Sequence, residues 1–566
     1  MSDTYRIGIV GAGSMGGAVA RGLVASGLYE GSQVLVCDHN PGKLEALAAE
    51  AGVTCLPDAE ALLAEGPDAV VLAIKPQVMA AFVRDHAEEL SRALVISIAA
   101  GLPIATYERM LPGARVVRVM PNLPISVRSG ASAVAAGAAC VLAQHALDQA
   151  SADQIAAAGA AVIQVPDTQA AVTALARAWR DRLEGRVIGI TGSTGKTTTK
   201  NLVRDVLVAA GSVCATKGNQ NNELGVPNTV LAAQADTRNV IVEMGMRGLH
   251  QLEELCGFVR PQWGLVTNVG ESHIELLGSR ENIARAKAEL LEALPAGGMA
   301  FVNAANDMTP KLLEFADLDS RGVTCVFYDG TAQAAERRAT LSAADAARPA
   351  VWSEDVRLDA AGCPRFALCA CGFDGMSEPV RVECALELRG MHNVSNACSA
   401  AAVGFAAGME AAQVAAALSG AKPEAGRQEV IEAPGGFTVI NDAYNANPDS
   451  MRASLSTFAA LDVAGARIAV LGDMGELGSF APQLHEEVGA FAAECGLDRL
   501  VCVGQLAQGI AAGAQKAGMP ADCIAMVADG AAALADVREH VASGSAVLVK
   551  ASHFMALEKV VEGLVE

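Results

Sequence analysis

The sequence predicts an α/β protein whose domains contain mainly parallel sheets with helices on both faces. Uninterrupted apolar runs, such as 69–74 and 94–98, are typical of strands buried on both faces. These runs alternate with helix-like stretches along the whole chain, as in doubly wound folds. The 566 residues exceed what one core accommodates, so three Rossmann-like or P-loop-type domains are expected.

Composition limits the classes of partner and compartment. The formal net charge of −21 argues against nucleic-acid binding by phosphate neutralisation, although a local basic site for a nucleotide remains compatible with it. The 14 cysteines have no regular spacing, and the N-terminus does not resemble a signal peptide. We therefore expect a cytoplasmic protein.

Two stretches could be interpreted as a zinc site and as a membrane span, but their residue types argue against both. Cys363, Cys369 and Cys371 form the only tight cysteine group, but a zinc site needs a fourth ligand at suitable spacing, so we interpret them as strand cysteines. Residues 129–147 lack Asp, Glu, Lys and Arg and are long enough to span a bilayer. Because they are mostly Ala, Gly and Ser, no membrane insertion is expected.

The N-terminal stretch has the pattern of a dinucleotide-binding site. An apolar strand at 5–10 leads into a G-x-G-x-x-G turn and a helix-like run, and the next strand, 34–37, is followed by an acid. A purely structural turn is the alternative, and the choice between NAD and NADP stays open. The predicted NAD(P)-binding residues are Gly11, Gly13, Met15, Gly16 and Asp38.

Residues 5–137 resemble the nucleotide-binding half of pyrroline-5-carboxylate reductase. The segments that carry the resemblance are VLAIKPQVM at 71–79, VISIAAG at 95–101 and VRVMPNLP at 117–124. The helical domain that holds the imine substrate in that family has no counterpart in this chain. A hydride donor site without an acceptor site cannot turn over, so reductase activity is not expected.

A phosphate-binding loop is predicted at 188–200, IGITGSTGKTTTK, where an apolar strand enters a glycine turn and then a helix. Glycines let backbone N–H groups approach phosphates, the lysine reaches the outer phosphates, and the following threonine hydroxyl suits Mg²⁺. Ile190 replaces the first glycine of the strict motif, and a turn that binds nothing is the alternative. The predicted ATP-binding residues here are Gly192, Ser193, Thr194, Gly195, Lys196, Thr197 and Thr198.

Three downstream residues have the chemistry of a metal site. Glu243 follows the buried strand 240–242, where an acid near a phosphate loop supports Mg²⁺. His273 follows a further strand and offers a neutral nitrogen. Lys287 lies on a helix. Each also has an ordinary explanation, namely a solvated strand-end acid, a loop histidine and a surface lysine.

The chain from about 138 to its end resembles the Mur ligase family. The motifs are ITGSTGKTTTK at 190–200, NNELGVP at 221–227, TNVGESHIELLGSRENI at 267–283, GMHNVSN at 390–396 and NDAYNANPDS at 441–450. They occur in order and without large gaps. The resemblance implies an ATP-dependent ligase that activates a carboxylate as an acyl phosphate, with UDP-N-acetylmuramoyl-tripeptide and D-Ala-D-Ala as substrates.

The resemblance also implies roles for single residues. Lys196 and Thr197 correspond to the phosphate clamp and a metal ligand, Glu243 and His273 to further metal ligands, and Lys287 to a lysine that holds Mg²⁺ as a carbamate. The remaining implied residues are His392 and Asn393 near adenine, Asn303 next to the nucleotide, Arg427 at the γ-phosphate, Asp442 at ribose, and Asn445 and Asn447 beside the acyl phosphate. An ordinary turn at 441–449 is the alternative for the last three.

The predicted domains are 1–137, dinucleotide-binding; 138–184, a remnant of the ligase UDP-binding domain; 185–421, ATP-binding; and 422–566, Rossmann-like. Because most of the UDP-binding domain is missing, we expect weakened binding of the UDP-linked peptide. A ligase is the leading hypothesis; the alternatives are a reductase-like oxidoreductase and a non-catalytic chimera. The third residue of the tripeptide and the oligomeric state stay open.

Overall fold

The computed structural model describes residues 5–25, 29–74, 76–98, 104–111, 113–118, 140–144, 155–156, 161–376, 378–424 and 426–566. Clustering of the chain gives two compact units, Met1–Ala171 and Val172–Glu566, and each is described by itself. The domain boundary predicted at 137/138 lies outside the described residues.

The first unit contains a six-stranded parallel sheet with β1 and β4 at its centre. Alternate side chains of β1 face opposite sides, since Ile9 packs in one buried cluster and Val10 in another. The strand order is β3 (Thr54–Leu56), β2 (Val34–Cys37), β1 (Ile7–Val10), β4 (Ala69–Leu72), β5 (Leu94–Ser97) and β6 (Arg115–Arg118). A separate parallel pair comprises β7 (Cys140–Ala143) and β8 (Ala161–Gln164).

The helices of the first unit connect these strands, so the unit consists of repeated strand–helix steps. They are α1 (Ser14–Ala25), α2 (Pro41–Ala51), α3 (Ala59–Ala64), α4 (Pro76–Asp85), α5 (Ala87–Leu90) and α6 (Ile104–Met110). The helix α9 (Thr168–Arg180) follows β8 and leads into the second unit.

The second unit begins with a nine-stranded sheet, which we call the central region (residues 172–424). Its order is β10 (Val213–Ala215), β11 (Asn239–Glu243), β9 (Arg186–Thr191), β12 (Trp263–Val266), β13 (Met299–Asn303), β14 (Thr324–Asp329), β15 (Ala350–Leu358), β16 (Pro364–Cys371) and β17 (Val380–Ala385). Strands β10 to β15 pair in parallel, and β15 to β17 pair antiparallel.

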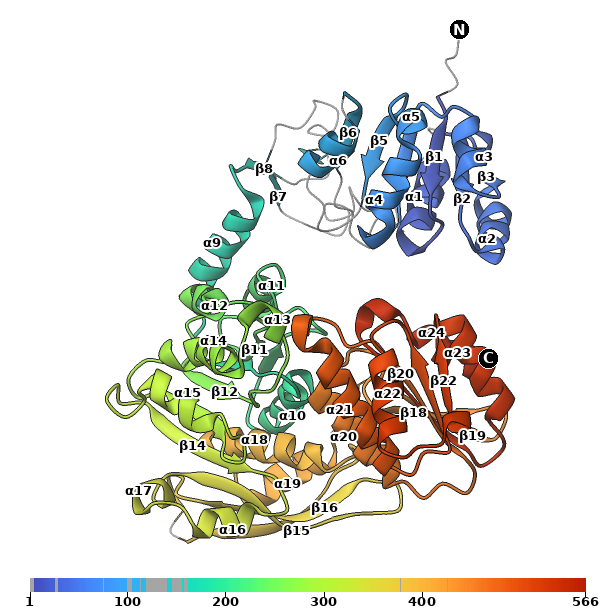
Figure 1. Ribbon diagram of the computed structural model, residues 1–566. Coiled ribbons are helices and arrows are strands. Elements are labelled where there is room, and N and C mark those ends of the chain that lie inside the picture. Colours follow the sequence, from blue (N-terminus) through green and yellow to red (C-terminus); the bar gives the residue numbers. More distant parts are fainter. Residues whose placement is uncertain are drawn as a thin grey trace. The chain divides into compact units, whose positions relative to one another are not determined.

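Helices cover both faces of the parallel part of this sheet (Figure 1). One face packs on α11 (Gly225–Ala232), α12 (Gln251–Val259), α14 (Arg280–Glu292) and α15 (Thr309–Ala316). The other packs on α10 (Lys196–Val208), α18 (His392–Ala406) and α19 (Ala411–Ser419). Along β11, Val240 and Val242 belong to the first core and Ile241 to the second, which explains the uninterrupted apolar run.

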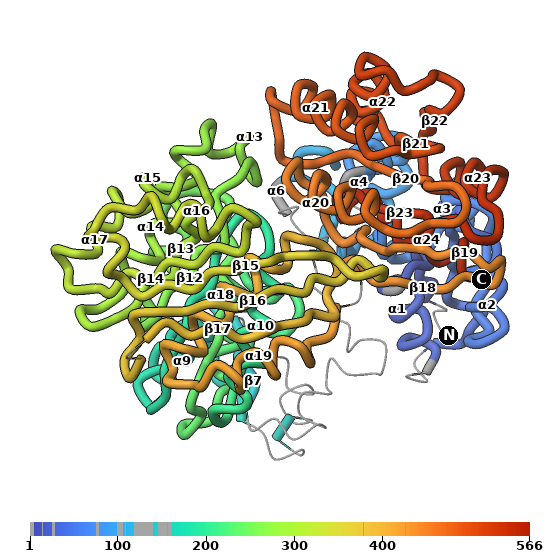
Figure 2. The backbone as a smooth tube through the Cα atoms, turned by 90° about the horizontal axis from the view of Figure 1, so that it is seen from below, coloured from blue at the N-terminus to red at the C-terminus, as the bar shows by residue number. Residues whose placement is uncertain are grey.

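The antiparallel extension β15 to β17 was not predicted, and Figure 2 shows its strands running as neighbours beyond β14. The cysteine prediction in this extension is confirmed for Cys369 and Cys371, which lie in β16, whereas Cys363 directly precedes that strand. The short helices α16 (Ala334–Ala339) and α17 (Ala343–Ala346) connect β14 to β15.

The C-terminal region (residues 426–566) contains a six-stranded sheet that is parallel except at one edge. Its order is β18 (Glu429–Ala433), β19 (Phe437–Asn441), β23 (Ala546–Lys550), β20 (Arg467–Gly472), β21 (Arg499–Val503) and β22 (Ile524–Val527), and β18 pairs antiparallel. Its helices are α20 (Pro448–Ala459), α21 (Ala481–Glu494), α22 (Gln508–Lys516), α23 (Gly530–His540) and α24 (Glu558–Val565).

These sheets confirm the predicted fold class, an α/β protein with mainly parallel, doubly wound sheets. Their polarity has a functional consequence, because ligands of such folds bind at the carboxyl ends of the strands. Within the described ranges, no helix combines the length and apolarity needed to cross a membrane.

Candidate active site

The phosphate loop joins the carboxyl end of β9 to the first residue of α10. Gly192 and Gly195 adopt φ angles of +152° and +76°. A Cβ on Gly192 would lie 1.7 Å from Thr267 Oγ1, so the neighbouring strand end leaves no room for a side chain. Ile190, which replaces the first motif glycine, is fully buried in β9. The substitution therefore falls within the strand rather than in the turn.

Neighbouring residues hold this loop in a defined shape. The Thr194 N–H donates to Asn268 Oδ1 at 2.9 Å, and the Ser193 N–H donates to the Asn268 carbonyl at 3.1 Å. The Lys196 ammonium folds back and donates to the Gly192 carbonyl at 2.7 Å. Burial lowers the pKa of Lys196. An ammonium that is largely removed from water is stabilised by an anionic ligand.

Glu243 ends β11 directly beside the loop and is 1 % exposed. Its Oε1 accepts hydrogen bonds from Asn221 Nδ2 at 2.8 Å and Thr197 Oγ1 at 3.3 Å. Its Oε2 is buried and has no hydrogen-bond partner among the residues that the structure describes, and the Lys200 ammonium lies 3.8 Å away. A buried carboxylate oxygen without a partner is costly, and a hard divalent cation would satisfy it. Glu243 and Thr197 therefore fit a magnesium site.

His273 and Lys287 differ in their surroundings. His273 lines the cavity from the residue before α13 (Ile274–Leu277), and its Nδ1 pairs with Glu476 of the C-terminal region. Lys287 is 1 % exposed on α14, and among the described residues its ammonium has no hydrogen-bond or ion-pair partner. Burial, together with the nearby charge of Lys196, lowers the pKa of Lys287 well below its ordinary value.

A cavity of about 820 Å³ brings most of the predicted ligase residues together. Both the central and the C-terminal region line it. The lining includes Ser193, Thr194, Gly195, Lys196, Thr197, Thr198, Glu243, His273, Asn303, His392, Asn393, Arg427, Asp442, Asn445 and Asn447. Two predicted residues, Gly192 and the buried Lys287, are not in the lining.

The cavity lining includes the ring and the amides that are expected beside the nucleotide. His392 opens α18, and burial lowers its pKa to about 4, which keeps the imidazole neutral. Asn393 donates to the Arg389 carbonyl at 2.6 Å. Asn303, at the end of β13, donates to the Thr267 carbonyl at 3.2 Å. These bonds fix the side chains in place before any ligand binds.

The C-terminal region contributes an arginine that reaches the phosphate loop. Arg427 Nη2 donates to Thr197 Oγ1 at 3.0 Å, and its guanidinium lies 4.3 Å from the centre of the Tyr444 ring. Asn447 caps α20 through the Ser450 N–H and donates to Ser272 Oγ at 2.7 Å. Both contacts join residues that are more than 170 positions apart in the sequence.

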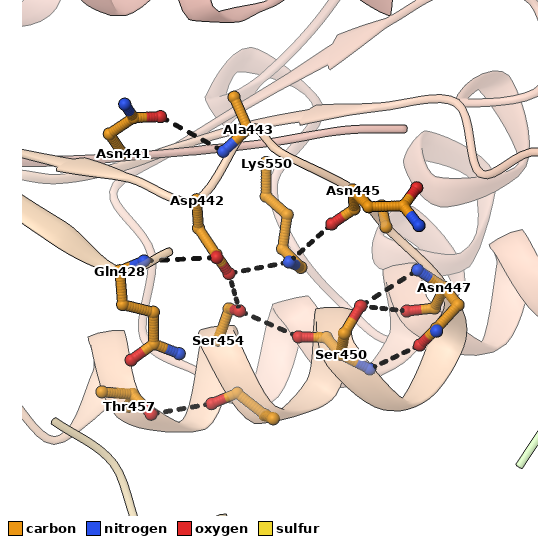
Figure 3. A network of polar contacts seen from close by, with 12 residues as sticks. Gln428, Asn441, Asp442, Ala443, Asn445, Asn447, Ser450, Ser454, Thr457 and Lys550 are labelled. Atoms are coloured by element: carbon orange, nitrogen blue, oxygen red, sulfur yellow. Dashed lines mark hydrogen bonds and ion pairs between the residues drawn. The ribbon is translucent and has the colours of Figure 1, made fainter. Parts of the chain in front are cut away.

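Asp442 belongs to a buried polar network at the carboxyl ends of β19 and β23 (Figure 3). Lys550, which is 2 % exposed, donates to Asp442 Oδ2 at 2.7 Å and to the Asn445 carbonyl at 3.0 Å. Ser454 also donates to Oδ2, and the Gln428 N–H donates to Oδ1 at 3.3 Å. One acceptor position of Oδ1 therefore stays open on the cavity side.

Sequence reasoning missed several residues of this site: Asn221, Tyr444, Glu476 and Lys550. Lys550 had a usable signal, since it is a cation at the end of an apolar strand in a doubly wound fold. Glu476 gave no comparable signal, because its contact with His273 joins residues that are 203 positions apart.

In the first unit, the glycine turn has the predicted local geometry. Gly11 has φ +103°, and a Cβ on Gly16 would lie 1.8 Å from the Gly11 carbonyl oxygen. Asp38 follows β2, and its Oδ2 accepts the Ala12 N–H at 2.7 Å. The predicted acid therefore contacts the turn between Gly11 and Gly13, next to the helix that contains Met15 and Gly16.

Comparison with known proteins gives matches along most of the chain. Residues 190–404 match the Mur ligase middle domain, and residues 426–553 match the Mur ligase, glutamate ligase domain. Residues 6–101 match the family described as NADP oxidoreductase coenzyme F420-dependent, in agreement with the nucleotide-binding resemblance of this stretch.

Two curated relatives are named UDP-N-acetylmuramoyl-tripeptide--D-alanyl-D-alanine ligase. The protein from Mycobacterium tuberculosis is 39% identical over 397 residues, which cover 67% of this chain and 72% of the relative. The protein from Bacillus subtilis is 34% identical over 406 residues, which cover 72% and 81%. A crystal structure of MurF from Acinetobacter baumannii matches with a TM-score of 0.63 at 26% identity, covering 75% of this chain and 90% of that one.

The predicted resemblance is thereby confirmed from the phosphate loop to the C-terminal region. With these matches in the same order as the motifs, the chain belongs to the Mur ligase family.

Proposed function

We propose that this Mur ligase is an ATP-dependent amide-bond ligase of peptidoglycan precursor synthesis that adds D-Ala-D-Ala to UDP-N-acetylmuramoyl-tripeptide. The observation that supports this most is the meeting of three groups at one cavity. These groups are the phosphate loop, the unpartnered Glu243 oxygen and Arg427 from the other region. The names of the relatives supply the substrates.

The loop and Arg427 are suited to a triphosphate. Lys196 leaves the Gly192 carbonyl and pairs with the outer phosphates, and the N–H groups at the start of α10 face the same anion. Arg427 adds a planar fork of donors from the C-terminal region. His392 and Asn393 then lie beside the base, Asn303 lies next to the nucleotide, and the open acceptor position of Asp442 takes a ribose hydroxyl.

Thr197, Glu243 and His273 would hold Mg²⁺, which when bound neutralises the charge that develops on the transferred phosphoryl group. Because burial lowers the pKa of the Lys287 amine, this group is suited to become a carbamate. It adds to CO₂ with formation of an N–C bond and loss of one proton. The resulting anion replaces a buried, unpartnered amine by a metal ligand.

In the proposed reaction, a carboxylate oxygen of the tripeptide attacks the γ-phosphorus of ATP, and ADP leaves. The dipeptide amine then attacks the carbonyl carbon of the acyl phosphate, and inorganic phosphate leaves with the former carboxylate oxygen. Asn445 and Asn447 line the cavity, and their amide N–H groups would donate to the oxyanion of the tetrahedral intermediate. Asn447 is already oriented by Ser272.

The test is phosphate release from ATP in the presence of Mg²⁺, UDP-N-acetylmuramoyl-tripeptide and D-Ala-D-Ala, with each component omitted in turn. Release that depends on both the tripeptide and the dipeptide supports the ligase. Dipeptide-independent release, or none, contradicts it. Pyrroline-5-carboxylate with NAD(P)H serves as the control for the reductase alternative.

The domain arrangement is part of the proposal. We assign ATP binding to 185–421 and the closing domain to 422–566, and this division is supported by the separate family matches. Residues 138–184 form only a remnant of a UDP-binding domain, so ATP affinity is retained while affinity for the UDP-linked peptide is lowered. Isothermal titration that gives the UDP-peptide affinity of an intact ligase would contradict this assignment.

Two further assignments remain predictions. NAD(P)H binding at Gly11, Gly13, Met15, Gly16 and Asp38 is testable by titrating the protein against NADH and NADPH fluorescence. A cytoplasmic location is supported by the 14 free cysteines, none of which forms a disulfide.

A further inference from the structure

The loop after β20 makes a contact to the metal site that the proposed function does not use. It contains Gly472-Asp473-Met474-Gly475-Glu476, and it leads to the short helical turn Gly478–Phe480. The Glu476 carboxylate pairs with His273 Nδ1 through Oε2 and lies 3.4 Å from Arg247 Nε through Oε1. The Glu476 carbonyl accepts the Glu275 N–H at 3.3 Å.

Both partners of the central contact have unusual backbone conformations. His273 has φ +66° and Glu476 has φ +61°, a left-handed region that costs non-glycine residues free energy. Such conformations persist only where surrounding structure holds them, and they gather at functional sites. His273 and Glu476 both have this conformation and contact each other across two regions of the chain. We take this as an indication that the surrounding structure maintains the His273–Glu476 contact.

The loop that presents Glu476 is firmly anchored in the C-terminal region. Met474 is fully buried, and its N–H donates to His485 Nε2 at 3.0 Å. The Gly475 N–H donates to Ser552 Oγ at 2.9 Å. On the opposite side, a Cβ on Gly478 would lie 2.7 Å from Glu275 Cγ, so the two regions meet closely. Glu476 therefore moves with the C-terminal region.

Resting on the function proposed above, we propose that Glu476 is a positioning residue that couples closure of the C-terminal region to assembly of the metal site. A metal-binding histidine commonly donates its second ring N–H to a carboxylate, which fixes both the tautomer and the ring orientation. Here the Glu476 carboxylate accepts a hydrogen bond from the Nδ1–H of His273. The Nε2 lone pair is thereby kept available for the cation.

This arrangement makes metal binding and closure reciprocal. When the C-terminal region is apart, His273 loses the group that selects its tautomer, and the site holds the cation less tightly. When Mg²⁺ is bound, the oriented His273 favours the closed arrangement by the same free energy. ATP would therefore be committed to reaction only after the region that supplies Arg427 has closed.

The test uses the full chain, with Mn²⁺ as the probe and a non-hydrolysable ATP analogue, and electron paramagnetic resonance measures free Mn²⁺. We expect Glu476→Gln to weaken Mn²⁺ binding by about tenfold, at the lower end of the effect of removing such a partner. The matched control is Glu486→Gln. Glu486 is similarly exposed, 44% against 39% for the Glu476 side chain, but pairs with Lys516 inside the C-terminal region.

Two further measurements separate positioning from direct ligation and from general loosening. In a His273→Ala background, Glu476→Gln should have no additional effect on Mn²⁺ affinity, since it acts through His273; an additive loss would overturn the proposal. Amide hydrogen exchange at 272–278 should rise in Glu476→Gln and not in Glu486→Gln. Unchanged Mn²⁺ affinity in Glu476→Gln would also overturn it.

The same experiments distinguish failure of this inference from failure of the proposed function. If wild-type protein binds Mn²⁺ with the nucleotide and releases phosphate in a dipeptide-dependent way, the ligase stands, and an unaffected Glu476→Gln variant refutes only the coupling. If wild-type protein binds no Mn²⁺ with the nucleotide, both proposals are refuted.

Discussion

Glu243→Gln tests the metal site most directly, because the substitution keeps the shape of the side chain and removes only its charge. The Oε2 position has no hydrogen-bond partner in the free protein. Two unit charges about 4 Å apart interact by about 4 kcal/mol at an effective dielectric constant near 20, which is a lower bound for a carboxylate beside a divalent cation. The substitution also removes the cost of burying a charged oxygen without a hydrogen bond, and this offsets roughly 1–2 kcal/mol of the lost attraction. The net loss of about 2.7 kcal/mol corresponds to a hundredfold weaker complex.

Ligand-induced stabilisation converts this loss into a measurable shift. At a nucleotide concentration of 100 Kd, wild-type protein gains about 2.7 kcal/mol, whereas a variant with hundredfold weaker binding gains only about 0.4 kcal/mol. For a region of this size, the difference amounts to roughly 5–10 °C in Tm. All three tryptophans, Trp179, Trp263 and Trp352, lie in the central region. Tryptophan fluorescence therefore reports its unfolding separately from the other sheets.

The shift has to be compared within each protein, with and without Mg²⁺ and ATP. Glu243→Gln also leaves the buried Lys200 without its nearby anion, so the unliganded Tm falls as well. Glu289→Gln is the control, because the Glu289 carboxylate is buried but accepts only backbone N–H groups of 250–253. It should lower the unliganded Tm and keep the ligand shift. A full ligand shift in Glu243→Gln would refute the metal assignment.

Three other substitutions test further parts of the site. Lys196→Ala should abolish phosphate release through loss of the clamp, a fall of roughly 10²–10³-fold; unchanged turnover in the phosphate assay would remove the assignment. Arg427→Lys should lower kcat by about tenfold or more while leaving the Tm near that of wild type, because a point charge cannot replace the planar fork. His392 has a folded-state pKa of about 4, below the ordinary value of 6.5, so the unfolded chain binds more protons between these values. The free energy of unfolding should fall by roughly 3 kcal/mol from pH 6.5 to pH 4. In His392→Gln, the free energy of unfolding from urea denaturation should depend less on pH over this range. An equal pH dependence in both proteins would exclude His392 as the cause.

Local sequence was sufficient where the chemistry and the fold share one short segment. The phosphate loop was predictable because a strand, a glycine turn and a helix start follow one another within 13 residues. Glu243 was predictable for a similar reason, since an acid at the end of a buried parallel strand must lie at the ligand edge of the sheet. The antiparallel strands β15 to β17 had no comparable sequence signal. They extend the sheet from β14, and this strand edge exists only after the parallel part of the sheet has folded.

The contacts between the two regions could not be predicted from spacing. Glu476 meets His273 across 203 positions, and Lys550 meets Asp442 across 108 positions. Both contacts depend on how segments far apart in the sequence are placed in the folded protein. A local sequence motif contains no information on that placement. The burial of Lys287 could not be predicted from its local sequence either. Its sequence context is that of a surface helix, but the fold buries it without a partner, which makes the free amine chemically unusual.

All of these contacts, and with them the proposed catalytic centre, are formed by residues of the second unit. Arg427, Asn447 and Glu476 each reach the central region within the second unit: Arg427 precedes β18, and the other two lie in loops that leave the carboxyl ends of β19 and β20. Their partners, Thr197, Ser272 and His273, follow the carboxyl ends of β9 and β12. The cavity is therefore a property of two facing strand edges in residues 172–566. Following the proposed function, we expect that exchanging the domain that precedes them alters substrate capture, whereas the groups proposed to activate the carboxylate stay in place.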